Sequence, residues 1–393
     1  MLDWVIIGGG VHGTYLSNVL VNQIDVGSDR VVVVDPFAEP LARWKHCTKN
    51  TGMTHLRSPV VHHLGLGPMD LLEFSRSSAG RKVADFRPPY DRPGLELFEV
   101  HTREIIEQGN LRALREQGRA SALSRSERGG FQVETDRGVL EARQVVLATG
   151  SGEKLAWPSW AGELLEQGAR VEHIFDQKFR AEDLKEGEEV IIVGLGISGA
   201  QLAQRLATRQ SLGVTLLGRQ GVKVHQFDSE PCWLGPKCQA PFRKVKDYKE
   251  RRELINQARH RGSMPQDVAL GLEQLTQWER VKLKNGEVDQ ARVLSEGRVE
   301  LFLESGERLE ATTIILATGF ESPRVDQSWL GASIEELGLE CSACGFPLVN
   351  QALQWAPGLW VSGPLAELEL GPAARNIAGA RMAGRRIAAA SGQ

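Results

Sequence analysis

Apolar and polar positions follow two periods along this chain, and the change from one period to the other occurs twice in the same way. A short β-branched run at residues 5–7 leads into three glycines and then into a segment with helical spacing. A second run, at residues 190–193, leads into a glycine-rich segment and again into helical spacing. Short apolar runs predict buried strands, and a 3.6-residue period predicts a helix. The sequence therefore predicts two strand–turn–helix units.

The first glycine turn has the spacing of a dinucleotide-binding site. Gly8 allows the tight turn, Gly10 lets the backbone approach a pyrophosphate, and Gly13 lets the helix pack closely on the strand. The phosphates would rest on free N–H groups at the helix N-terminus. Asp35 ends the next apolar run, about 20 residues further on, where a carboxylate accepts hydrogen bonds from ribose and repels a 2′-phosphate. This site is predicted to bind FAD or NAD.

The second glycine turn repeats the spacing but not the acidic residue. Gly194, Gly196 and Gly199 occupy the three glycine positions. The next apolar run ends at Arg219, where the first unit has Asp35. A guanidinium can fork onto a 2′-phosphate, so the second site favours NADPH over NADH. The alternative is that Arg219 is an ordinary surface cation.

Both units close with the same short sequence, which is a second repeat. An apolar run ends in Ala-Thr-Gly at Thr149 and Gly150, and another ends in Ala-Thr-Gly at Thr318 and Gly319. Such small residues let the chain pass close to a bulky ligand, so all four are candidate cofactor contacts. A last predicted strand ends at Gly363, and the segment from residue 371 is predicted to open a helix that runs to residue 390.

These elements predict an α/β fold with two Rossmann-like dinucleotide-binding domains of three layers each, the second inserted into the first. We expect the first domain to comprise residues 1–152 and 320–393, and the second residues 153–319 with a helical insert at about 222–275. Local spacing further predicts the following segments: a helix at 95–117, a hairpin at 131–142, a linker at 151–158 and a charged helix at 244–262.

Charge and composition exclude several classes of protein. The formal charge of −3 over 393 residues is not that of a nucleic-acid-binding protein, and the basic residues of the predicted charged helix alternate with acidic ones, as on a solvated face. No apolar run approaches the roughly 20 residues of a membrane span. The first strand begins almost at Met1, and five cysteines do not make a disulfide framework. We expect a soluble protein of the reducing cytoplasm, with no membrane or nucleic-acid partner; the sequence leaves open a homo-oligomer.

The order of these motifs resembles that of the class B flavin-dependent monooxygenases, including the N-hydroxylating enzymes. Their second fingerprint often reads G-x-G-x-S-G, which would place Ser198 with the three glycines at the cofactor. The segment around Asn50 resembles the Asn-Thr segment that lies near the reactive flavin carbon in these enzymes, so the resemblance implies a catalytic role for Asn50. The chain departs from the family at Pro364, because many relatives have an Asp there that holds the FAD ribityl chain.

The resemblance implies FAD at the first turn, NADPH at the second, and a monooxygenase. NADPH would reduce the flavin, and reaction with O₂ would give a C4a-hydroperoxyflavin. This species would then oxygenate a small amine or another soft nucleophile. The cofactor would carry the chemistry, which explains why the sequence shows no acid–base pair.

Two other functions remain open from the sequence. One is an NADPH:acceptor flavin reductase, in which Cys341 and Cys344 act as a redox pair; the other is a non-catalytic flavoprotein that senses redox state. Cys232 and Cys238 would complete a four-thiolate zinc site with that pair, although free or buried thiols are the simpler interpretation. The substrate is not encoded in any local pattern, because pocket residues come from loops.

Overall fold

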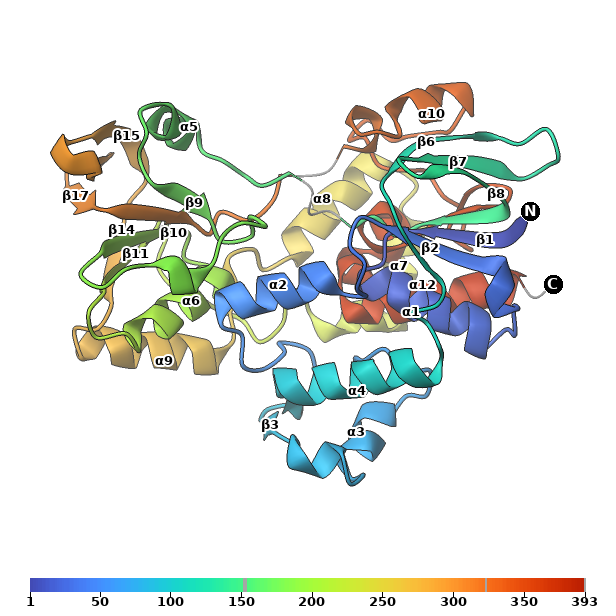
Figure 1. The fold of residues 1–393 in the computed structure, drawn as a ribbon, viewed down its shortest axis with the longest axis horizontal. Helices are drawn as coiled ribbons and strands as arrows, with labels where there is room; N and C mark the ends of the chain where they lie inside the picture. Colours follow the sequence, from blue (N-terminus) through green and yellow to red (C-terminus); the bar gives the residue numbers. More distant parts are fainter. Residues whose placement is uncertain (151–153, 322–323, 392–393) are drawn as a thin grey trace.

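The fold is built on two β-sheets whose central strands run parallel, each with helices on its faces (Figure 1). The structure is a computed structural model and describes residues 1–150, 154–321 and 324–391. Smaller pairings of two or three strands flank the two main sheets.

The first sheet has the strand order β5-β2-β1-β8-β20-β19, and β7 and β6 extend it from the N-terminal half of β8. The strands β1, β2, β5, β8 and β20 are parallel, and the β7–β8 pairing confirms the predicted hairpin. The strands are β1 (Leu2–Ile7), β2 (Val31–Asp35), β5 (Arg115–Gln117), β6 (Ala120–Arg125), β7 (Phe131–Thr135), β8 (Gly138–Leu147), β19 (Gln354–Ala356) and β20 (Leu359–Val361).

Helices cover one face of this sheet, and a more irregular layer covers the other (Figure 1). Apolar side chains of α1, α4 and α12 pack with β1 and β2 in one core, and those of β6, β7 and α10 pack with the opposite face. The helices associated with this sheet are α1 (Val11–Asn22), α2 (Ala42–Thr51), α3 (Asp70–Ser75), α4 (Leu95–Gln108), α10 (Gly331–Glu336), α11 (Glu367–Leu370) and α12 (Ile377–Ser391). The pair β3 (Phe86–Arg87) and β4 (Arg92–Pro93) lies in the segment between α3 and α4.

The second sheet is parallel throughout, with the order β14-β11-β10-β18-β9. Its strands are β9 (Val171–His173), β10 (Glu189–Val193), β11 (Gly213–Gly218), β14 (Lys282–Asn285) and β18 (Thr313–Leu316). One face packs against α6 (Ile197–Ala207) and α9 (Gln266–Gln277). The other packs against α5 (Ser159–Glu166) and the antiparallel sheet of β15 (Val288–Val293), β16 (Val299–Leu303) and β17 (Arg308–Ala311) (Figure 1).

The two sheets repeat one topology, since the first strand of each unit is central, with the second and third strands on one side and the fourth on the other. This is the doubly wound order of dinucleotide-binding folds. The predicted fold class is therefore confirmed. The insert between β11 and β14 contains α7 (Pro236–Lys244), α8 (Tyr248–Ala258) and the pair β12 (Lys223–Val224) and β13 (Ser263–Met264).

Three predicted helices have different bounds in the structure. The helix predicted at 95–117 ends at Gln108, because Asn110 adopts a left-handed φ of 48° and the chain then enters β5. The charged helix predicted at 244–262 is shorter, α8 at Tyr248–Ala258, because α7 ends at Lys244 and Val245 is extended. The C-terminal helix begins at Ile377 rather than at residue 371, because residues 372–375 form a 3-10 turn.

The chain passes between the two sheets twice, and the two passages touch. Leu155 and Phe320 form an isolated antiparallel bridge, and the N–H of Glu321 donates to the Lys154 carbonyl at 3.0 Å. Residues 151–153 of the predicted linker 151–158 lie outside the described residues, and so does the whole segment 322–323. The limits of the two domains therefore stay a prediction.

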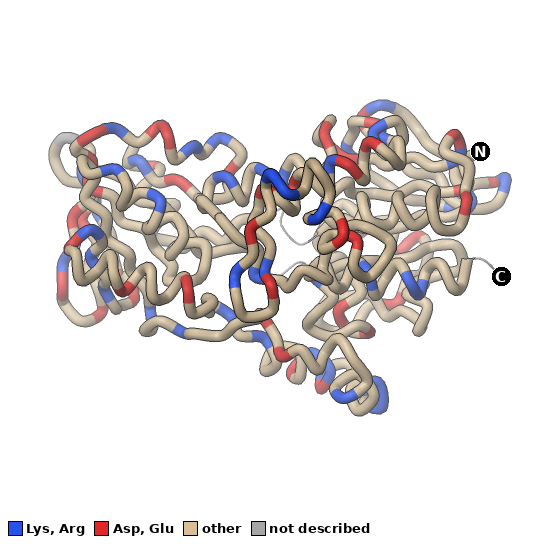
Figure 2. The backbone as a smooth tube through the Cα atoms, turned by 90° about the horizontal axis from the view of Figure 1, so that it is seen from below, with Lys and Arg blue, Asp and Glu red and all other residues tan. Residues whose placement is uncertain are grey.

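Charges of both signs are distributed over both halves of the molecule (Figure 2). The predicted solvated face of the charged helix is wrong for Arg251 and Arg252, which bind carboxylates of α11. Arg251 lies 3.1 Å from Glu369, and Arg252 lies 2.8 Å from Glu367, a carboxylate with no exposed surface. These ion pairs fix the insert to the C-terminal segment. Among the described residues, no helix combines the length and apolar character needed to cross a bilayer.

A buried histidine pair, His63 before α3 and His101 in α4, makes stability depend on pH. The rings of His63 and His101 lie 5.4 Å apart, and His101 lies 5.2 Å from the Phe74 ring. Burial lowers the pKa of each histidine to about 4. Both rings are therefore neutral in the folded protein at pH 6, where the unfolded chain begins to bind protons.

We expect the free energy of unfolding to fall as the pH drops from 6.5 towards 4. In that window the unfolded state binds more protons than the folded state, so lowering the pH favours unfolding by about 2–3 kcal/mol for each histidine. Urea unfolding at a series of pH values measures this change. His101→Phe keeps an aromatic ring beside Phe74 and should make the dependence shallower by the share of one histidine, since burial also lowers the pKa of His12, His62 and His173 to about 4; an equally steep curve in that variant would contradict this assignment.

Candidate functional site

The first glycine turn is compact on its inner side and open on its outer side. Gly8 has a φ of 106°, and a Cβ on it would collide with the Ala148 carbonyl. A Cβ on Gly13 would collide with the Gly8 carbonyl, so helix α1 packs directly on the turn. Gly10 has no atom within 4 Å of its Cβ position. The turn therefore leaves a free approach to the backbone at Gly10, at the N-terminus of α1.

Asp35 lies beside this turn, at the carboxyl end of β2. Its carboxylate accepts hydrogen bonds from the N–H groups of Gly9 at 2.5 Å and Phe37 at 2.9 Å. Arg115 is the first residue of β5, the strand beside β2. Its guanidinium lies 3.4 Å from the same carboxylate and donates to the Phe37 carbonyl at 2.7 Å. The sequence analysis missed Arg115, since it belongs to no motif. Together these contacts hold the carboxylate at the edge of the sheet where ribose hydroxyls are expected.

His12 is a second residue that the sequence analysis missed. It lies in the first turn of α1, and its Nδ1 is 2.8 Å from the Ser362 hydroxyl. Its ring lies beside Gly363, which has a φ of 72°. Burial lowers the pKa of His12 to about 4, so the ring is neutral at pH 7. Its Nε2 is buried and has no hydrogen-bond partner among the described residues. Its place inside the glycine motif, two residues after Gly10, is the signal that could have identified it.

The second glycine turn has the same geometry as the first. Gly194 has a φ of 126°, and a Cβ on it would lie 2.5 Å from the Ala317 carbonyl oxygen. A Cβ on Gly199 would collide with the Gly194 carbonyl, whereas a Cβ on Gly196 would meet only the Gly262 Cα, at 3.6 Å. This turn also opens outward at its middle glycine. Two equivalent approaches to a helix N-terminus thus exist in one chain.

The residues predicted around the second turn lie at the same end of the sheet. Arg219 directly follows β11, with 76% of its side chain exposed, and lies 3.5 Å from the Glu287 carboxylate. Ser198 lies in the first turn of α6 and is partly exposed. An exposed guanidinium after the second strand is available to a 2′-phosphate. Cofactor contacts of both residues stay a prediction.

The two Ala-Thr-Gly segments lie where the chain leaves the sheets. Gly150 and Gly319 have φ values of 72° and 82°, which explains the glycine at both positions. The Thr318 hydroxyl donates to the Ala156 carbonyl at 2.5 Å and lies 3.3 Å from His173 Nε2. Thr318 therefore contacts the passage between the sheets. Contacts of Thr149, Thr318 and both glycines with a cofactor stay a prediction.

A protein-family model, described as pyridine nucleotide-disulphide oxidoreductase, matches residues 2–384. The chain belongs to this family. The prediction of an oxidoreductase is confirmed. A comparison with curated protein sequences found no match.

Several solved structures of other proteins resemble this chain over nearly the full length of both chains. Ornithine hydroxylase from Pseudomonas aeruginosa has a TM-score of 0.75 at 16% identity, covering 100% of this chain and 99% of that one. Ornithine N-hydroxylase from Kutzneria sp. 744, with reduced FAD, NADP⁺ and L-ornithine, has a TM-score of 0.73 at 16% identity, covering 99% and 98%. Bacillithiol disulfide reductase from Bacillus cereus has a TM-score of 0.61 at 16% identity, covering 100% and 98%. At these identities the likeness establishes a shared fold.

Asn50, the predicted catalytic residue, lies in the last turn of α2 and contacts the segment after β9. Its side chain is 1% exposed. Its amide nitrogen donates to the carbonyls of Ile174 at 3.1 Å and Phe179 at 3.2 Å, and lies 3.0 Å from His46 Nε2. These contacts connect the first sheet's helices to the second sheet. The amide oxygen has no partner within the described part of the chain, and a catalytic role for Asn50 stays a prediction.

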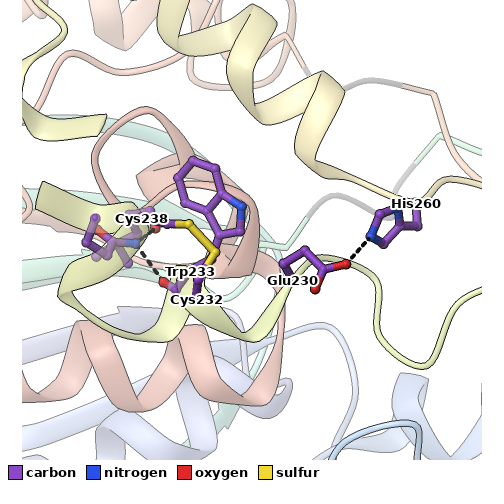
Figure 3. The surroundings of a disulfide bond; sticks show 7 residues. Glu230, Cys232, Trp233, Cys238 and His260 are labelled. Atoms are coloured by element: carbon purple, nitrogen blue, oxygen red, sulfur yellow. Dashed lines mark hydrogen bonds and ion pairs between the residues drawn. A yellow bond between two sulfur atoms is a disulfide. The ribbon is translucent and has the colours of Figure 1, made fainter. Parts of the chain in front are cut away.

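One pair of cysteines is bonded in a way that the sequence analysis did not predict. Cys232 and Cys238 form a disulfide, so the interpretation of free thiols and the four-thiolate zinc site are both wrong for this pair (Figure 3). Sequence reasoning weighed their spacing for zinc and not for a bond between them. Gln239 donates from its amide to the carbonyls of Trp233 at 2.8 Å and Leu370 at 2.7 Å, which fixes the disulfide loop to the segment before α12. The remaining thiols are those of Cys47, Cys341 and Cys344.

We expect thiol titration of the denatured protein to show this pairing directly. Without reductant, three of the five cysteines should react with a thiol reagent, and all five should react after reduction. Cys232→Ser should release Cys238 and raise the unreduced count to four. A count of five in freshly purified, unreduced wild-type protein would contradict the disulfide.

Proposed function

We propose that this protein binds FAD at the first glycine turn and NADPH at the second, and that it uses O₂ to hydroxylate a small amine. The supporting observation is the duplicated turn, open at Gly10 and at Gly196, on two parallel sheets whose connecting passages touch. The proposal assigns residues 1–152 and 320–393 to FAD and residues 153–319 to NADPH.

The residues at the first turn fit an adenine dinucleotide without a 2′-phosphate. The N–H groups at the start of α1 would hold the pyrophosphate, and Asp35 would accept the ribose hydroxyls. His12 offers a buried nitrogen without a partner next to Gly363, a suitable group for a sugar or ribityl hydroxyl in the place of the missing Asp. When bound, the flavin supplies hydride acceptance and oxygen chemistry.

An amine substrate is proposed from the fold shared with two N-hydroxylating enzymes, one of which was solved with L-ornithine. The test is the consumption of NADPH in air with a panel of primary amines, including ornithine and lysine, with detection of the hydroxylamine product. We expect NADPH oxidation to be coupled to product with at least one amine. If the flavin is reduced but only hydrogen peroxide forms across the panel, the monooxygenase assignment fails.

Arg219→Ala tests the nucleotide assignment. We expect KM for NADPH to rise about 10–100-fold, because a charge-assisted contact to phosphate is worth about 1.5–3 kcal/mol, while kcat/KM with NADH changes little. Arg308→Ala is the matched control, since Arg308 is also exposed and lies on β17 of the same half. Equal losses with both nucleotides would show that Arg219 does not contact the 2′-phosphate.

A second candidate function is an NADPH-dependent disulfide reductase, which the Cys232–Cys238 disulfide and the fold shared with bacillithiol disulfide reductase favour. Its product would be a thiol instead of a hydroxylamine. The variant with serine at both positions separates the two functions. Loss of NADPH-dependent thiol release in that variant would support the reductase, and unchanged thiol release would dismiss a role for this disulfide.

A further inference from the structure

Three side chains that could bind a metal ion meet in the insert, and none of them belongs to either glycine turn. His225, Glu230 and His260 each offer one ligand atom, and these atoms lie within 4.8 Å of one another. The two imidazole rings stack at 3.8 Å between centroids with 7° between their planes. Nε2 of His260 lies 3.2 Å from the Glu230 carboxylate, from which it is drawn with a dashed line in Figure 3.

The backbone that carries the two histidines is fixed by contacts unrelated to any ion. The N–H of His225 donates to the Met264 carbonyl at 3.0 Å, next to the β12–β13 pairing. The N–H of His260 donates to the Asp228 carbonyl at 2.8 Å. Arg57, from the segment after α2, donates to the His225 carbonyl at 2.8 Å. The backbone positions of the two histidines are therefore set before any ligand arrives.

We propose that His225, Glu230 and His260 bind one divalent transition-metal ion of the Zn²⁺ class. Two imidazole nitrogens and one carboxylate oxygen are a borderline donor set that suits Zn²⁺, Co²⁺ and Ni²⁺ and does not suit Ca²⁺ or Mg²⁺. Bonds of about 2.0–2.2 Å require tetrahedral ligand atoms roughly 3.4 Å apart. The three ligand atoms lie within 4.8 Å of one another, so the side chains would move closer together around the ion; His225 and Glu230 are exposed, and water would complete the coordination.

The ion would join two chain segments beside the second glycine turn. His260 lies two residues before Gly262, whose Cα is 3.6 Å from the Cβ position of Gly196. His225 lies on the opposite segment, which follows Arg219 and β12. A bound ion would therefore hold residues 225–230 against residues 259–262. Metal binding at this cluster does not depend on the proposed function.

The competing interpretation is a simple ion pair between Glu230 and His260 with a stacked neighbour. Zinc titration of the whole protein, without an affinity tag and after treatment with a chelator, separates the two. We expect one Zn²⁺ per chain by isothermal titration calorimetry, and a Co²⁺ complex with visible absorption bands. His225→Ala and His260→Ala should each weaken binding about tenfold or more, and Glu230→Gln should weaken it less.

Controls identify the binding groups. Cys341→Ser with Cys344→Ser removes two free thiols that could bind Zn²⁺, and His62→Ala removes a histidine outside the cluster; both should leave Zn²⁺ binding unchanged. Circular dichroism checks that each variant is folded. If no binding is detected at about a 100-fold molar excess of Zn²⁺, the proposal is overturned. It is equally overturned by affinity that survives both histidine variants or disappears with the thiols.

Discussion

Gly10→Val is expected to give a folded protein that has lost its FAD. Gly10 has φ −74° and ψ −159°, a conformation that valine adopts without strain. No atom of the described residues lies within 4 Å of its Cβ position, so a valine side chain fits there without a clash. It would occupy the space through which a pyrophosphate approaches the N–H groups of α1. The loss of affinity should therefore be a hundredfold or more, about 3 kcal/mol.

The measurement is the ratio of flavin to protein absorbance after purification and after reconstitution with excess FAD. Thermal unfolding of the flavin-free proteins checks that the variant is folded. Gly162→Val is the matched control, because Gly162 also has open space at its Cβ position but lies in α5. A yellow Gly10→Val protein with a normal flavin content would place the flavin elsewhere.

Gly13 would give a less informative variant, and the comparison explains why. A Cβ on Gly13 would collide with the Gly8 carbonyl, so even alanine must deform the turn. Loss of FAD in Gly13→Ala would therefore not distinguish a blocked cofactor from a damaged fold. The middle glycine is the position where the requirement comes from the ligand alone.

The sequence predicted the features that are set by short segments. Buried strands, glycine turns and the acidic residue of Asp35 all lie within about 30 residues, and each has a local conformational cause. The doubling of the pattern then predicted the fold, since two strand–turn–helix units with a return strand have few other arrangements. The helix at 95–117 was predicted too long, because the left-handed turn at Asn110 interrupts a spacing that otherwise continues into β5.

The features that the sequence did not predict depend on contacts between distant segments. Arg115 reaches Asp35 only because β5 lies beside β2. Arg252 looked like a residue on a solvated helix, but α8 packs where its guanidinium meets the buried carboxylate of Glu367. Similarly, the five-residue gap between the cysteines at 232 and 238 is compatible with a bond, with a metal or with neither. Tertiary structure decides such cases, and local periodicity carries no information about them.

Gly196→Val is expected to give a protein that keeps its flavin but is barely reduced by NADPH. Gly196 has φ −97° and ψ −178°, which valine tolerates, and the nearest atom to its Cβ position is the Gly262 Cα, at 3.6 Å. The side chain would fill the approach to the N-terminus of α6, where the proposed NADPH pyrophosphate binds. The first glycine turn belongs to the other sheet, so flavin content should equal that of the wild type.

Anaerobic stopped-flow absorbance at the flavin band measures the effect. At sub-saturating NADPH the rate of reduction should fall by about a hundredfold, the equivalent of roughly 3 kcal/mol of lost binding. Dithionite, which needs no nucleotide site, should reduce the flavin of variant and wild type equally. Comparison with Gly10→Val then separates the two turns: one variant lacks the flavin, and the other lacks only its reductant. If Gly196→Val is reduced by NADPH at the wild-type rate, hydride reaches the flavin by a route that does not involve the second turn, and the two-nucleotide arrangement is wrong.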